Sequence, residues 1–303
     1  MTRKSLLAGA GALAAIGLAF TATAASAQAS GSGGGSPPPG PRSAGLGAEQ
    51  EAQLAQKHDG YYGALAPENL KKFAKRKVPF DLTGTWFINL RHSFADFMFG
   101  PPYPEFYDAG KKAMVEAAAA AKAGKPYRDS IGECYPAGLP MIETRVWPVG
   151  MIQLPTVIWI TYAFTNSYRA IYLDDRKFTD PDIAVYTYNG ESIGHWEGNK
   201  LVVHAKYFET NKHYIDMGIP IDDKFEMTEI YSMPDKETLQ IDAIMTDPTM
   251  WKGEWKSTHR WIRQHYSDVP EVECLPNLNA HLPSTEEGQA AIKAREEEKA
   301  PGK

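Results

Sequence analysis

The chain has 303 residues, of which 32 are Lys or Arg and 37 are Asp or Glu, giving a formal net charge of −5 at pH 7. This mildly acidic balance excludes the strongly basic footprint with which proteins bind nucleic acid. Aromatic residues make up 11% of the chain, including seven Trp and fifteen Tyr, which predicts a large core or an aromatic-lined pocket.

Residues 1–27 are predicted to form a signal peptide. Arg3-Lys4 precedes the apolar run Leu6–Phe20, and Ala25-Ser26-Ala27 has the small-residue pattern of a cleavage site. The apolar run is too short for a comfortable membrane span, so no span is expected after cleavage. The mature chain is therefore expected to begin near Gln28 and to be periplasmic or secreted. An uncleaved N-terminal anchor is the alternative.

The next segments are predicted from their composition. Residues 28–45 form a flexible linker of Gly, Ser and Pro. A helical N-terminal segment follows over 46–78, broken at Gly60 and at Pro67. A β domain is expected over 79–268, with an Ala-rich helical insertion near 111–124. A C-terminal extension over 269–303 is expected to hold a short helix that begins at Ser284.

From Met151 onward, apolar and polar residues alternate with the period of two that is typical of β-strands. Turn residues separate β-branched and aromatic segments at 81–90, 157–164, 168–173, 201–208, 224–231, 239–245 and 254–263. Connections this short join antiparallel neighbours. We therefore expect a mainly β fold, with an antiparallel meander of eight or nine strands over 84–264. Such a sheet loses its edges by closing into a barrel or folding into a sandwich, and we expect the barrel.

Cys134 and Cys274 are the two cysteines of the chain. In an exported protein an even pair predicts one disulfide, and two unpaired thiols are the alternative. The eight histidines show no metal-ligand spacing, and no CxxC motif accompanies the cysteines. No metal and no cofactor are expected.

The segment GESIGHWEGNKLVVH, residues 190–204, predicts a β-hairpin. Gly198 and Asn199 supply the turn, and Trp196 is expected to pack beside Val202 across the two strands and close one end of the core. The hairpin does not explain His204, because strand alternation places it on one face with Val202 and Phe208. Either a hydrogen-bonded structural histidine or a functional one fits this pattern.

Gly84-Thr85-Trp86, at the start of the first predicted strand, resembles the lipocalin and wider calycin signature. The resemblance implies a calycin-like barrel whose floor is closed by Trp86. It also implies a basic residue from a late strand, Arg260 or Arg263, packed across that ring by a cation–π contact. The mouth of such a barrel takes a small, mostly apolar molecule.

The segment from about 134 to 274 resembles an uncharacterised family of exported proteobacterial and acidobacterial proteins. The matching pieces are CYPAGLP at 134–140, YRAIYLDDR at 168–176, SIGHWEG at 192–198, and Asp247-Pro248 followed by Trp255. Asn199 and His204 stand where the family's hairpin has aspartates. The resemblance implies an exported protein and carries no particular activity.

Strand alternation also suggests a site inside the barrel. His204, Glu229 and His259 are each expected to share a strand face with apolar residues, and to converge with Arg169 inside the barrel. A buried glutamate among apolar side chains is either paired or raised in pKa. With a histidine or arginine it suits general acid–base chemistry, and a purely structural ion pair is the alternative. The residues expected to line a ligand pocket are Trp159, Tyr162, Arg169, Phe225, Tyr231, Trp255, His259 and Trp261.

Three functions are consistent with these features. The first is binding of a small hydrophobic or aromatic molecule in the periplasm, with Arg169, His204 and Glu229 orienting it. The second is a hydratase, isomerase or lyase in the same barrel, with Glu229 or His204 carrying the proton. The third is a structural envelope protein. Residues 190–194, GESIG, have the letters of the GxSxG motif, but Ser192 is expected within a strand and not at a sharp strand-to-helix turn. Nucleophilic serine chemistry is therefore not expected. Oligomeric state stays open.

Overall fold

The computed structural model describes residues 62–90, 99–125, 128, 130–215, 218–275, 290 and 293. The predicted signal peptide, the linker and much of the N-terminal helical segment lie outside the described residues. So does most of the helix predicted to begin at Ser284. Within the described part of the chain, no helix combines the length and the apolar character needed to span a bilayer.

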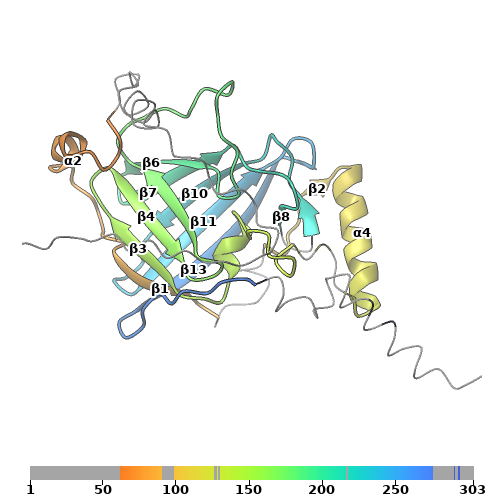
Figure 1. Ribbon diagram of the computed structural model, residues 1–303. Coiled ribbons are helices and arrows are strands. Elements are labelled where there is room, and N and C mark those ends of the chain that lie inside the picture. Colours follow the sequence, from red (N-terminus) through yellow and green to blue (C-terminus); the bar gives the residue numbers. More distant parts are fainter. Residues whose placement is uncertain are drawn as a thin grey trace, which may run out of the picture. The chain divides into compact units, whose positions relative to one another are not determined.

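Nine strands form a closed barrel in the order β1-β13-β11-β10-β7-β6-β5-β4-β3, and β1 pairs with both β13 and β3 (Figure 1). Their bounds are β1 Gly84–Ile88, β3 Val149–Gln153, β4 Val157–Tyr162, β5 Ser167–Tyr172, β6 Glu191–Glu197, β7 Lys200–Lys206, β10 Glu226–Ser232, β11 Thr238–Thr246 and β13 Glu254–Gln264. The predicted mainly β fold with a closed barrel is confirmed. The sequence did not predict β3, a short strand that follows a Pro-rich irregular segment.

Smaller elements surround the barrel. They are α2 (Pro67–Phe73), β2 (Glu105–Phe106), α4 (Asp108–Lys122), the 3-10 helix η1 (Met141–Thr144), β8 (Tyr214–Ile215), β9 (Ile219–Pro220) and β12 (Trp251–Lys252). Helix α4 is the predicted Ala-rich helix, and the chain turns at Gly124 with a positive φ of 66°. Helix α2 is held to the barrel wall because Asn69 Nδ2 donates to Asp174 Oδ2 over 2.9 Å.

The β6–β7 hairpin has the predicted two-residue turn, because Glu197 pairs with Lys200 across it. One detail of the expected register was wrong. Trp196 pairs with Leu201, and Val202 lies opposite His195. A shift of one residue reverses the face on which a strand side chain lies. The inward side chains of β7 are therefore Leu201 and every second residue after it, beginning with Val203.

One strand pair departs from the antiparallel meander. β5 and β6 run parallel, and they pair only through Ile171 with Ser192 and Tyr172 with Ile193. The connection over 173–190 is long enough to carry the chain back along the barrel, as a parallel pair requires. The first half of β5 therefore has no ladder to β6, which leaves a break in the barrel wall beside Arg169.

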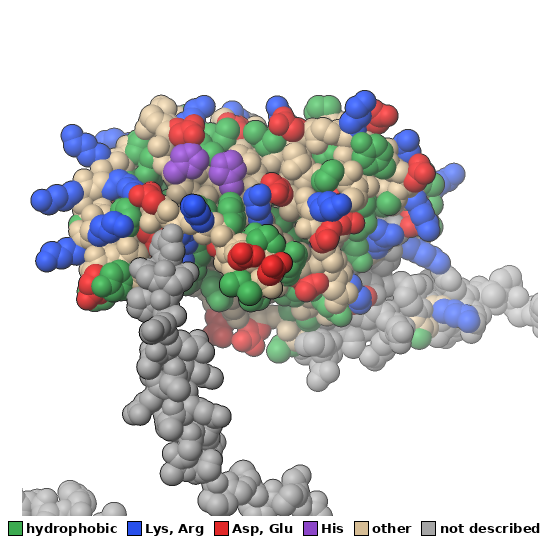
Figure 2. Space-filling model, turned by 90° about the horizontal axis from the view of Figure 1, so that it is seen from above, with side chains coloured by type: hydrophobic (Ala, Val, Ile, Leu, Met, Phe, Trp, Pro, Cys, Tyr) green, Lys and Arg blue, Asp and Glu red, His purple; other side chains and the backbone are tan. Residues whose placement is uncertain are grey.

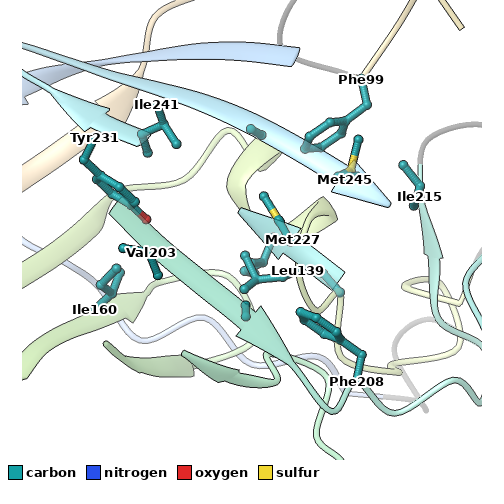
Figure 3. Close-up of a cluster of buried hydrophobic side chains, with 14 of the residues drawn as sticks. Phe99, Leu139, Ile160, Val203, Phe208, Ile215, Met227, Tyr231, Ile241 and Met245 are labelled. Carbon is teal, nitrogen blue, oxygen red and sulfur yellow. The ribbon is translucent and has the colours of Figure 1, made fainter. Parts of the chain in front are cut away.

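Side chains fill much of the barrel interior. Figure 3 shows Met227 next to Leu139, and the hydroxyl of Tyr231 pointing inward near Val203. Leu139 comes from the segment before η1, which inserts into the barrel. The largest buried side chains include Trp86, Trp251, Trp255 and Trp261. The interior of the described barrel is therefore a packed core with polar groups embedded in it.

Trp86 is fully buried, and its Nε1 donates to Leu82 O over 2.8 Å. The cation above its ring is Arg263, whose guanidinium carbon lies 4.2 Å from the ring centroid. Of the two basic residues expected from the sequence, Arg263 makes this contact, whereas Arg260 does not. Its Nε donates to Gln240 Oε1 on β11, because it occupies the opposite face of β13 from Trp261. Gly84 is favoured here because its φ of 143° is one that L side chains rarely adopt, and a Cβ would also lie 2.6 Å from Arg263 Nη1.

We expect Arg263→Met to lower the free energy of unfolding by about 1–2 kcal/mol, from a lost cation–π contact and lost hydrogen bonds. Arg263 Nη1 donates to Thr83 O over 2.6 Å and Nη2 to Asp81 O over 3.1 Å. Urea denaturation measures the difference. Arg260→Met is the matched control on the same strand, and an equal or larger loss in that variant would contradict the assignment.

The predicted disulfide is present. Cys134 and Cys274 are bonded, with their Cα atoms 5.5 Å apart. The bond therefore links the segment before η1 covalently to the chain that follows β13.

Candidate functional site

A charged network crosses the barrel interior. Arg169 on β5 reaches Glu229 on β10 with both terminal nitrogens, and Nη1 lies 3.0 Å from Oε1. The hydroxyl of Tyr231 donates to the same Oε1 over 2.8 Å, and Arg169 Nε donates to Ser192 Oγ over 3.0 Å. All four residues are buried. A two-pronged arginine–carboxylate pair of this kind has the geometry of a strong charge-assisted interaction.

Glu143 adds a second carboxyl to the network from η1. Its Oε1 lies 3.5 Å from Arg169 Nη1, and its side chain is fully buried. Glu143 was not predicted from the sequence as a site residue. Its segment has no strand or helix period, so alternation gave no face for Glu143. The one available signal was a lone acidic residue between Ile142 and Thr144, shortly after a disulfide-bonded cysteine.

The two carboxyls differ in charge state. Burial raises the pKa of Glu143 well above its usual value, and repulsion from Glu229 adds to the rise. Burial also acts to raise the pKa of Glu229, but attraction to Arg169 and a hydrogen bond from Glu143 outweigh it and hold the pKa below its usual value. Glu143 is thus protonated and donates to an ionised Glu229. With Arg169 charged, the network has no net charge.

Tyr162 lies beside this network. It occupies β4, where it pairs with Ser167 of β5, and its inward face also carries Ile160, the partner of Arg169. The Tyr162 hydroxyl is buried, and its proton has no acceptor among the described residues. Burial raises the pKa of Tyr162 far above its usual value, although the Arg169 guanidinium beside it acts to lower that pKa. Arg169 is itself a donor and cannot accept the proton. Tyr162 is therefore a neutral donor held next to Arg169.

β13 carries further buried nitrogens. Both ring nitrogens of His259 are unpaired within the described part of the chain, as are the indole nitrogens of Trp255 and Trp261. Phe99 packs edge-on against the His259 ring, with centroids 4.7 Å apart. Burial lowers the pKa of His259 to about 4, so the ring is neutral at neutral pH. Together with Tyr162, these side chains give the interior an excess of hydrogen-bond donors.

A cleft of about 820 Å³ lies over the break between β5 and β6. Its walls come from β5, the connection 173–190 and the Cys134–Cys274 disulfide. Ser167 and Arg169 are among the lining residues, so the cleft extends to the edge of the charged network. Three large apolar side chains in it are unusually exposed, namely Tyr168 at 64%, Ile183 at 73% and Val185 at 76%.

Two predicted site residues do not lie in the interior. Trp159 is on the outer face of β4, where its ring lies 5.7 Å from that of Tyr168. His204 is on the outer face of β7, where Nδ1 is 3.0 Å from Thr228 Oγ1 and the ring stacks on His195 at 5.9 Å. Strand alternation turns both away, since the inward positions of those strands are Ile160 and Val203.

The other predicted site residues lie on inward faces. Tyr162, Arg169, Glu229, Tyr231, Trp255, His259 and Trp261 are all buried in the barrel. Phe225 is also buried, but its ring packs against Phe208 at 5.0 Å and Trp251 at 6.2 Å. Figure 2 shows basic and acidic side chains mixed with hydrophobic ones on one outer face, with no extended area of a single charge.

No family model matches the chain, and no curated protein does. Solved structures are similar to it in part. The crystal structure of fluorescent protein UnaG, wild type, shares 14% identity at a TM-score of 0.30, over 60% of this chain and 97% of that chain. The crystal structure of a UnaG mutant shares 15% identity at a TM-score of 0.29, over 61% of this chain and 97% of that chain.

Proposed function

We propose that this protein binds a small, mostly apolar molecule in the cleft beside β5, with the ligand's polar end directed at the Arg169 network. The observation that carries the proposal is that the cleft reaches Arg169 at a break in the barrel wall. Sites for small molecules combine an apolar lining with a few placed polar groups, and this arrangement has both.

The size and lining of the cleft support this class of ligand. A volume of about 820 Å³ lies within the range of about 300–1,000 Å³ common for such sites. Ile183 and Val185 expose most of their apolar surface there. A ligand that covers this surface gains about 25 cal/mol for each Å² of apolar area removed from water. The ligand we propose therefore lies mainly in the cleft, and the packed interior receives only its polar end.

Two other functions have an observation in their favour. The packed barrel interior favours a structural envelope protein. The protonated Glu143 beside the ionised Glu229 favours an enzyme, because paired carboxyls with separated pKa values are typical of acid–base sites. His204 has no place in such a site. We also propose that the protein acts outside the cytoplasm, where its disulfide would persist.

Binding is tested with N-phenyl-1-naphthylamine, a neutral aromatic probe whose fluorescence rises in apolar surroundings. We expect Ile183→Asp/Val185→Asp to weaken probe binding at least tenfold, because it places two charges in the apolar lining. Both side chains are exposed, so the fold should tolerate the change. The readout is the dissociation constant from a fluorescence titration.

The matched control is Val115→Asp on α4, a valine that is 69% exposed away from the cleft lining. It should bind the probe as the wild type does. Mass spectrometry of small molecules that co-purify with the mature protein then gives the natural ligand. If the probe does not bind, or if the cleft variant binds it as well as the control, the proposed function is wrong.

A further inference from the structure

Most polar groups of the buried network are already paired. Glu229 accepts from Arg169, Tyr231 and the protonated Glu143. Arg169 Nε donates to Ser192. Leaving a buried polar group unpaired is unfavourable, and native proteins rarely do so without a functional reason. The Tyr162 hydroxyl is the donor of this cluster whose proton has no acceptor among the described residues.

Tyr162 is buried directly behind two residues that line the cleft. It pairs with Ser167 across β4 and β5, and Arg169 is its diagonal neighbour on the inward face. Both neighbours line the cleft. A ligand group that enters between β5 and the connection 173–190 therefore meets Ser167 first and the Tyr162 hydroxyl next.

The charges around Tyr162 select the kind of group that it can bind. Arg169 and Glu229 already neutralise each other. An anionic group would add an uncompensated charge beside Glu229, and a cationic group would face Arg169, both in a desolvated site. The free donor calls for an acceptor. A ligand hydroxyl would need an acceptor for its own proton, whereas a carbonyl oxygen only accepts.

We propose that the Tyr162 hydroxyl donates a hydrogen bond to the carbonyl oxygen of a neutral ligand, so that the ligand class is apolar or aromatic ketones and related neutral carbonyl compounds. This assignment rests on the proposed function and names its ligand class. It also assigns the ligand contact to Tyr162. Glu229 already accepts hydrogen bonds from three donors, and Glu143 is one of these donors.

The test compares three naphthalenes of matched shape. These are 2-acetylnaphthalene, a ketone, 2-ethylnaphthalene, which lacks the oxygen, and 2-naphthoate, an anion. Each is titrated by displacement of N-phenyl-1-naphthylamine. In the wild type we expect the ketone to bind about tenfold more tightly than either of the others. Tyr162→Phe should weaken ketone binding about tenfold and leave binding of 2-ethylnaphthalene unchanged.

Two further readouts keep the test independent of folding. Tyr162→Phe should unfold at a temperature no lower than the wild type, since the hydroxyl proton has no acceptor to lose. Tyr266→Phe, at a fully exposed tyrosine, is the control. In the wild type, the infrared carbonyl stretch of bound 2-acetylnaphthalene should move to lower frequency than in hexane, as a hydrogen bond requires. Tyr162→Phe should remove the shift.

Equal binding of 2-acetylnaphthalene and 2-ethylnaphthalene, with no effect of Tyr162→Phe, would overturn the carbonyl assignment and leave the proposed function standing. Tighter binding of 2-naphthoate would also overturn it, because it would show that Arg169 recognises an anion. Failure of the fluorescent probe and all three naphthalenes to bind would overturn both.

Discussion

Arg169→Met is expected to lower the free energy of unfolding by about 3–5 kcal/mol, the range for breaking a buried ion pair by removing one partner. The substitution keeps most of the side-chain volume but leaves Glu229 without its counter-charge in a fully buried site. Glu229 must then either stay ionised without a partner or take up a proton, and both are unfavourable in the interior. Urea denaturation at pH 7 measures the loss.

The control for this prediction removes both charges. Arg169→Met/Glu229→Leu should recover most of the lost stability, because replacing a whole buried ion pair with apolar residues is often neutral. Ser192, Tyr231 and Glu143 lose partners in this variant, so recovery is not expected to be complete. A double variant no more stable than Arg169→Met would show that the loss comes from packing and not from the unpaired charge.

His259→Phe is expected to change how stability depends on pH. Burial lowers the pKa of His259 to about 4, whereas a histidine in the unfolded chain titrates near 6.5. Between these values the unfolded chain binds a proton that the folded protein does not. The wild type therefore loses stability through this group as the pH falls from about 6.5 to about 4, by about 3 kcal/mol in total. Phenylalanine removes that contribution.

The measurement is the difference in unfolding free energy between wild type and His259→Phe at several pH values from 4 to 7.5. The difference between the two proteins is used because Glu143 changes the pH dependence of stability in the opposite direction, and its contribution is common to both. Its folded pKa is raised, so its contribution to stability is lost as the pH rises above about 4.3, the value for an unfolded glutamate. Trp255→Phe is the control, since it alters packing on β13 without removing a titrating group. A pH-independent difference for His259→Phe would contradict a neutral, buried His259.

The sequence predicted that Glu229 shares a strand face with large apolar residues, but it left open whether Arg169 and Glu229 point into the barrel. Glu229 lies two residues from Met227 and from Tyr231, and a strand with large apolar residues at those positions places all three on one face. Their pairing was not predictable. β5 and β10 are not neighbours in the sheet, and only the closed barrel brings their side chains together across the interior.

Trp159 and His204 show why alternation sometimes failed. Trp159 belongs to VIWITYAF, a segment so apolar that it indicates a strand without indicating which face is inward. His204 has apolar neighbours at Val202 and Phe208, and Val202 is buried although it lies on the outer face. Each assignment turned on one residue of register, which reverses every side chain of a strand.

The sequence by itself predicted most strands of the barrel, their turns and the cysteine pairing, because alternating hydrophobicity, turn residues and an even cysteine pair act through local backbone and solvation preferences. Only the tertiary structure decided which polar groups form the site. Closure of the barrel, the parallel β5–β6 pair and insertion of η1 bring Glu143, Tyr162, Arg169 and Glu229 together. Charge pairing and desolvation depend on distances in space, and residues far apart along the chain set those distances only once the barrel has formed.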